Sequence, residues 1–263
     1  MINNINKITR LNLTNSMFEC SIFDRLVFNT SVNKVLIFTV NLTSHINKVS
    51  TYWEYLSIQE KIKASKYYTE YLSKKYIISH GILRYILGFY TKQHPQKIEF
   101  NYSEYGKPFL KNSNIQFNMS HSYNMVSYII ALNYRVGIDI ELHDKNLNIE
   151  DFADLVLTLE EYKYLSSLKS RDKLRLFYIL WTKKEALVKA IGQGLSYPIN
   201  TIEVIRLLSG KGVLLNDKNN ELRQPWYCYE LEVPENYSGA IGIENKIDEI
   251  VYLEMNNQQN NFL

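Results

Sequence analysis

Two short stretches of the chain hold carboxylates at spacings that chemistry can use. VGIDIE contains Asp139 and Glu141, and WTKKEALVK contains Glu185 four residues before Lys189. Residues two apart on a strand share a face, and residues four apart on a helix share a stripe. Neighbouring carboxylates raise each other's pKa unless a cation lies between them. These carboxylates are therefore either surface charges that flank core residues or the walls of a metal site.

A magnesium site with bound phosphate is the functional interpretation of these two stretches. Mg²⁺ is held by one or two carboxylates together with substrate phosphate oxygens. Glu185 would then be a third ligand, and nearby lysines would hold the phosphates that the ion bridges. In the structural alternative, Glu185 and Lys189 form an ion pair that only supports the helix, by about 0.2–0.5 kcal/mol.

Two further segments carry polar groups next to predicted strands. FNMSHS contains Ser120 and His121, and the imidazole could be a core residue, a base or a phosphate donor. SEYGKPF contains the turn Gly106-Lys107-Pro108, which adds one cation. Neither segment alone identifies a function.

The composition is that of a folded protein with balanced charge. The 263 residues suit one large domain or two smaller ones, and 46% of them are hydrophobic. The net charge of +3 argues against a dedicated nucleic-acid binder. A basic excess between Glu60 and Lys97 could attract a small polyanion or form a solvated helix face.

The sequence also predicts a compartment. Two cysteines without a metal motif indicate a reducing environment. The first residues lack the apolar segment of a secretory signal, and no apolar run approaches the roughly 20 residues that span a bilayer. We therefore expect a soluble, cytoplasmic protein that does not bind membranes.

The hydrophobic pattern indicates the elements that position these residues. It predicts helices at 57–71, 73–90, 151–168 and 171–191 and strands at 35–42, 125–132 and 134–142. The last two strands are predicted to form a hairpin-like pair joined by Asn133. Residues 202–253 are predicted as a run of antiparallel strands. The order predicts an α+β (α/β) fold, as two halves meeting near residue 134 or as one continuous domain.

In this order, EYGKP, FNMSHS, VGIDIE and WTKKEALVKAIGQGLS resemble the signatures of the surfactin-type 4′-phosphopantetheinyl transferases. Two of those signatures read (V/I)G(I/V)D(I/V)E and W(T/S)xKEAxxKxxGxGL. The resemblance implies transfer of the phosphopantetheine arm of coenzyme A to a serine of an apo acyl or peptidyl carrier protein. Adenosine 3′,5′-bisphosphate is released, and the metal is Mg²⁺, with Mn²⁺ as an alternative.

The resemblance also implies an architecture. It predicts two similar α/β halves in a pseudo-dimeric fold, with the active site in the cleft between them. Residues 1–133 would contribute to coenzyme A binding, and residues 134–263 would carry the metal site and the catalytic helix. A monomer is expected. The carrier could serve fatty-acid, polyketide or nonribosomal-peptide synthesis.

Site roles follow from the resemblance position by position. The predicted metal ligands are Asp139, Glu141 and Glu185. The predicted catalytic residues are Glu161 as the base for the serine, with Glu160 as the alternative, and Lys189 and His121 at the phosphates. The predicted coenzyme A contacts are Lys63, Lys75, Tyr105, Gly106, Lys107, Pro108, Ser120, His121, Lys184 and Lys189.

Some positions depart from the family pattern, and two other functions stay open. Glu60, Ser65 and Tyr76 stand where basic or hydroxyl groups are expected, so the 3′-phosphate contacts are less defined than the metal site. One alternative is a carrier-protein-binding module of the same fold without catalysis. The other is a Mg²⁺-dependent nuclease or nucleotidyl transferase, which would need a longer basic track than residues 60–97 provide.

Overall fold

The computed structural model describes residues 7–13, 33–205 and 226–255. The helices are α2 (Val49–Tyr55), α3 (Ile58–Ser65), α4 (Glu70–Thr91), α5 (Glu150–Val156), α6 (Leu159–Ser166) and α7 (Ser170–Ile191). The strands are β1 (Lys7–Leu13), β2 (Lys34–Asn41), β3 (Phe100–Tyr102), β4 (Pro108–Leu110), β5 (Ile115–Ser122), β6 (Met125–Leu132), β7 (Val136–Leu142), β8 (Tyr227–Glu230), β9 (Tyr237–Ile243) and β10 (Glu249–Met255).

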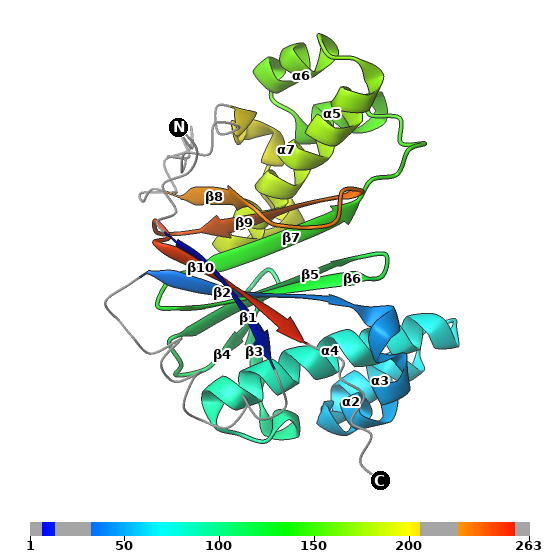
Figure 1. The fold of residues 1–263 in the computed structure, drawn as a ribbon, viewed down its shortest axis with the longest axis vertical. Coiled ribbons are helices and arrows are strands. Elements are labelled where there is room, and N and C mark those ends of the chain that lie inside the picture. Colours follow the sequence, from blue (N-terminus) through cyan, green and yellow to red (C-terminus); the bar gives the residue numbers. More distant parts are fainter. Residues whose placement is uncertain (1–6, 14–32, 206–225, 256–263) are drawn as a thin grey trace.

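Two sheets lie between two groups of helices (Figure 1). One sheet has the strand order β1-β10-β2-β6-β5, and α2, α3 and α4 lie on its outer side. The other has the order β7-β9-β8 and carries α7, with α5 and α6 beyond it. β3 and β4 form a separate two-stranded sheet. The predicted α+β class is confirmed, and the pseudo-dimeric relation between the halves stays a prediction.

Apolar residues fill the three spaces between these layers. On β2, Leu36 and Phe38 face the cluster around α4, whereas Val35 and Ile37 face a second cluster between the sheets. Ile138 of β7 meets the β2 residues in that second cluster. A third cluster lies around α7. Because strand side chains alternate, the central strand of each sheet must be apolar on both faces.

Two of the four predicted helices are confirmed as single helices: 73–90 lies within α4, which begins at Glu70 and ends at Thr91, and 171–191 corresponds to α7. Residues 57–71 were predicted as one helix, but α3 ends at Ser65 and α4 begins at Glu70, because the Thr69 hydroxyl caps α4 by accepting from the Leu72 amide. The predicted helix at 151–168 is two helices, since Thr158 and Glu161 form a capping box that starts α6. The prediction of 171–191 is confirmed within one residue, and Gly192 ends α7 at φ 89°.

The predicted hairpin of 125–132 and 134–142 is wrong. β6 pairs with β2 and β5, whereas β7 pairs with β9 in the other sheet. The wholly antiparallel tail is also wrong, because β10 pairs in parallel with β1 and β2. Within the predicted run of strands, residues 201–205 form no strand, and residues 206–225 lie outside the described residues. The division at residue 134 stays a prediction.

Membrane insertion has no helical candidate in the described ranges. None of the helices there combines the length and the apolar character that crossing a bilayer requires.

Candidate functional site

The site forms where the edge strands of the two sheets, β5 and β7, lie next to each other. Three alternate residues of β5 reach β7 through their side chains. Asn118 accepts from the Ile138 amide at 3.0 Å, and the Ser120 hydroxyl donates to Asp139 at 2.8 Å. The Ser122 hydroxyl donates to Glu141 at 2.8 Å and accepts from the Leu142 amide. Side chains therefore replace a backbone ladder between the two sheets.

Asp139 is the centre of this arrangement. Its side chain is buried, and its Oδ1 accepts from Lys189 Nζ at 2.6 Å and from the Ser120 hydroxyl. Lys189 Nζ also donates to the Ser120 oxygen at 3.0 Å. The second oxygen, Oδ2, is buried and has no hydrogen-bond partner among the described residues. A buried carboxylate oxygen without a partner is costly and calls for an explanation such as an ion.

The pKa values of Glu141 and Glu185 are raised near Asp139. Burial, and next the Asp139 carboxylate, raise the pKa of Glu141 to about 7. The same two causes, in the same order, raise the pKa of Glu185. Three carboxylates thus face a common region in which their combined charge is unfavourable without a cation.

Two glycines let α7 approach the sheet closely enough to contribute to the site. A Cβ added at Gly137 would lie 2.1 Å from the Ala186 carbonyl oxygen, and one at Gly242 would lie 2.6 Å from the same atom. The helix backbone therefore rests directly on β7 and β9. This contact brings Glu185 and Lys189 of α7 to the carboxylates of β7.

Two lysines and two histidines lie around the C-terminal end of β5. Desolvation by the surrounding protein, and then the charges of Lys75 and Lys189, lower the pKa of His121. His80 of α4, with a pKa lowered to about 4 mainly by burial, is also influenced by Lys63 and His121. The predicted phosphate-binding residues Lys63, Lys75 and His121 therefore come together from three elements, α3, α4 and β5.

The Gly-Lys-Pro turn approaches the C-terminal end of α7. Lys107 Nζ donates to the Val136 carbonyl at 2.9 Å and to the Ala190 carbonyl at 3.1 Å. Burial is the main cause that lowers the pKa of this lysine to about 8. The side chain of Lys107 thus joins the start of β7 to the end of α7.

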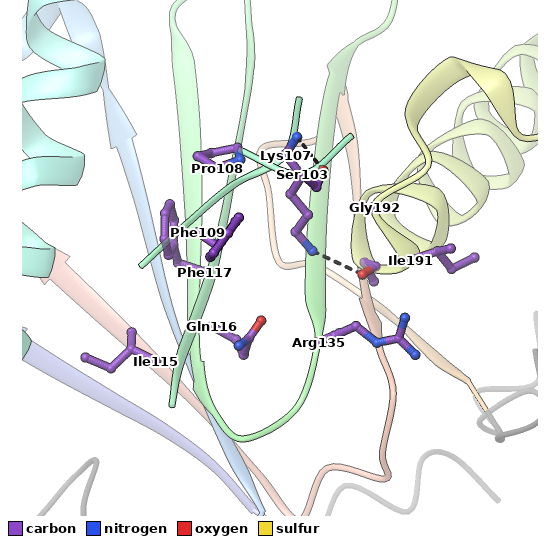
Figure 2. A pocket seen from close by; sticks show the side chains of 11 residues that line it. Ser103, Lys107, Pro108, Phe109, Ile115, Gln116, Phe117, Arg135, Ile191 and Gly192 are labelled. Carbon is purple, nitrogen blue, oxygen red and sulfur yellow. Dashed lines mark hydrogen bonds between the residues drawn. The ribbon is translucent and has the colours of Figure 1, made fainter. Parts of the chain in front are cut away.

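A pocket of about 180 Å³ opens beside this lysine, and Pro108, Phe117 and Gly192 are among the residues that line it. Figure 2 shows Lys107 reaching toward the end of α7, with Arg135 on the same side of the pocket. Of the other predicted turn residues, Tyr105 is exposed and Gly106 has φ 81°.

Glu161 and Lys184 are placed differently from what the sequence suggested. Both side chains are fully buried, and Lys184 Nζ lies 2.5 Å from Glu161 Oε2. Glu161 also accepts from the Thr158 and Val204 amides, and Lys184 donates to the Val156 carbonyl at 2.5 Å. The carboxylate is enclosed by these donors and withdrawn from solvent. The roles of Glu161 as the base and of Lys184 as a coenzyme A contact stay predictions.

Sequence reasoning missed Asn118, Ser122 and His80. The first two could have been found, because Asn118, Ser120 and Ser122 alternate on one strand face beside a predicted carboxylate strand. His80 lies in an apolar helix and carries no local signal. Only the tertiary packing of α4 brings His80 near His121.

The predicted metal centre is not assembled as a cluster of acidic or histidine ligands. In the parts of the chain that the structure describes, no group of three or more His, Cys, Asp or Glu side chains is placed to hold a metal ion. The ammonium of Lys189 neutralises Asp139 instead. Magnesium binding therefore stays a prediction.

Comparison with known proteins defines the family of this chain. The profile of the 4′-phosphopantetheinyl transferase superfamily matches residues 135–241. The 4′-phosphopantetheinyl transferase HetI of Nostoc sp. is 35% identical over 72% of this chain and 78% of its own length. The transferase Sfp of Bacillus subtilis is 27% identical over 72% of this chain and 83% of its own length. The transferase gsp of Aneurinibacillus migulanus is 35% identical over 54% and 56%. The chain belongs to the 4′-phosphopantetheinyl transferase superfamily.

Proposed function

We propose that this protein transfers the 4′-phosphopantetheine group of coenzyme A to a serine of an apo acyl or peptidyl carrier protein. The observation that carries the proposal is the junction of β5, β7 and α7. There Asp139, Glu141 and Glu185 face a common region beside Lys189. This combination of carboxylates and cations suits a metal-bound diphosphate.

The donor set fits magnesium, although no three-ligand cluster is preformed among the residues that the structure describes. Asp139 Oδ2 is buried without a partner in the described part of the chain. Burial, and next the Asp139 charge, raise the pKa values of Glu141 and Glu185, and a bound cation would favour their charged forms. These three side chains would hold the ion. When bound, Mg²⁺ would draw negative charge from the diphosphate oxygens of coenzyme A.

The remaining side chains have roles that follow from their positions. Lys189 lies next to Asp139 with its side chain partly exposed, so its ammonium can stabilise charge on the departing bisphosphate. Ser120 orients both Asp139 and Lys189 by hydrogen bonds. His121 and Lys75 supply further donors at the end of β5.

Glu161 and Lys184 would instead act by holding α6 against α7. Lys184 directly precedes Glu185, so its buried bonds to Glu161 and Val156 fix the turn of α7 that presents Glu185. Lys107 would likewise fix the C-terminal end of α7 rather than contact the ligand through its ammonium. The monomeric state, the cytoplasmic location and the two-halves division are also part of this proposal.

The decisive experiment is incubation with coenzyme A, Mg²⁺ and a panel of apo carrier proteins, followed by intact mass. We expect one carrier to gain a single phosphopantetheine group, and EDTA to prevent that gain. Asp139→Ala and Glu185→Ala are expected to lower transfer at least about 100-fold, the scale of losing a main electrostatic group. Their circular dichroism should stay that of the unmodified protein.

Three outcomes would contradict the proposal. Wild-type protein that modifies no carrier would favour the non-catalytic binding module. Full activity in EDTA would contradict the proposed role of a metal ion. Near wild-type transfer by Asp139→Ala would remove the assignment of this junction as the active site.

A further inference from the structure

A lysine beside the site is held between two tyrosine rings. Lys75 Nζ lies 5.3 Å from the ring centroid of Tyr71 and 5.6 Å from that of Tyr123. Tyr71 is one helical turn earlier on α4, and Tyr123 follows β5 directly after Ser122. The Tyr71 hydroxyl donates to the side-chain oxygen of Asn124. The start of α4 is therefore tied to the β5–β6 turn, which lies on the same side of the molecule (Figure 1).

Tyr123 has an unusual backbone for a large residue. Its φ is 51°, in the left-handed region that bulky side chains rarely adopt. The side chain is 63% exposed, so core packing does not compensate for this conformation. Ser122 pairs with Met125, so Tyr123 is the first residue of a two-residue hairpin loop, and such loops require a positive φ. Glycine, asparagine or aspartate is preferred in these loops, and the tyrosine found here places its ring beside Lys75 instead.

Lys75 acts electrostatically on the candidate site. Burial is the first cause that lowers the pKa of His121, and the charges of Lys75 and then Lys189 lower it further. Lys75 forms no ion pair with a carboxylate of the described residues, whereas the adjacent Lys74 pairs with Glu70 at 2.6 Å. A lysine without an acidic partner among the described residues, close to other basic side chains, can receive an anion.

We propose that Tyr71 and Tyr123 are positioning residues that hold the Lys75 ammonium as a receptor for a phosphate group of coenzyme A. The inference rests on the proposed function for the identity of the ligand. Each ring attracts the cation through its π face and restricts the flexible four-carbon stem. Less rotamer freedom is then lost when a phosphate binds.

The test is the dissociation constant of coenzyme A, measured by calorimetry without any carrier protein. Tyr123→Leu keeps an apolar side chain but removes the π face, and we expect binding about 2- to 5-fold weaker. Tyr123→Phe keeps the ring and should bind as wild type. Lys75→Met is expected to weaken binding about 10-fold or more, and the control Lys74→Met should have little effect.

Two readouts separate positioning from a purely structural role. If Tyr123 acts through Lys75, Tyr123→Leu should add nothing to the loss in Lys75→Met. Tyr123→Gly should leave the melting temperature unchanged or raise it, since glycine adopts this φ freely, while binding weakens as in Tyr123→Leu. A structural role would instead lower the melting temperature together with the affinity.

The outcomes that overturn this inference differ from those that overturn the function. Wild-type affinity in Tyr123→Leu beside weakened Lys75→Met would exclude positioning by the ring. Wild-type affinity in Lys75→Met would exclude the receptor. If the wild type binds coenzyme A but transfers nothing to any carrier, the proposed function fails while the binding results still decide this inference.

Discussion

The buried pair of Glu161 and Lys184 gives the sharpest test of how the site is built. Glu161→Gln keeps the size of the side chain and an oxygen for the Thr158 amide, but leaves the Lys184 ammonium buried without its counter-ion. Breaking a buried ion pair by removing one partner costs about 3–5 kcal/mol. For a chain of 263 residues, this lowers the melting temperature by about 6–20 °C, at roughly 2–4 °C per kcal/mol.

The assay is thermal unfolding together with transfer to a carrier protein at low temperature, where the variant is folded. A positioning role predicts that the folded variant keeps its rate within about tenfold. Loss of a general base would instead lower the rate by about 10²–10⁴-fold. Adding Lys184→Met removes the unpaired charge and should recover part of the lost stability.

Glu160→Gln is the matched control, because Glu160 is the exposed neighbour that sequence reasoning offered as the alternative base. We expect neither its stability nor its rate to change. The positioning role of Glu161 would be contradicted if Glu161→Gln melted within about 2 °C of the wild type and lost 100-fold or more in transfer rate. Glu161 would then be a catalytic base despite its burial.

Two further predictions concern stability. Gly137→Ala should destabilise the protein by at least about 1–3 kcal/mol in urea unfolding, because the new methyl group meets the α7 backbone at 2.1 Å; an unchanged unfolding midpoint would contradict the close approach of α7. His45 is buried, its ring is hydrogen-bonded to the Tyr52 hydroxyl at 2.7 Å, and burial lowers its pKa to about 4. Since the unfolded chain binds this proton first, the free energy of unfolding should fall by on the order of 3 kcal/mol as pH drops from about 6.5 to 4. His45→Gln should flatten that part of the pH profile, and an equally steep fall in the variant would assign it to other groups.

The sequence predicted those features that depend on spacing within one element. The period of a strand put Asp139 and Glu141 on one face, and the period of a helix put Glu185 and Lys189 on one stripe. The helix α7 was predicted within one residue of its bounds, since its apolar period and the glycine that follows it agree. The same local patterns, in their order along the chain, sufficed to indicate the family.

The tertiary structure decided which elements meet. Strand pairing joins residues far apart in the sequence, so no local pattern could show that β6 and β7 separate into different sheets or that β10 returns to lie between β1 and β2. The same holds within the site. Ser120 and Ser122 bind the carboxylates of β7 only because two edge strands are adjacent. Glu161 had the residue type of a base, and only its burial against Lys184 indicates that it supports the site rather than reacts in it.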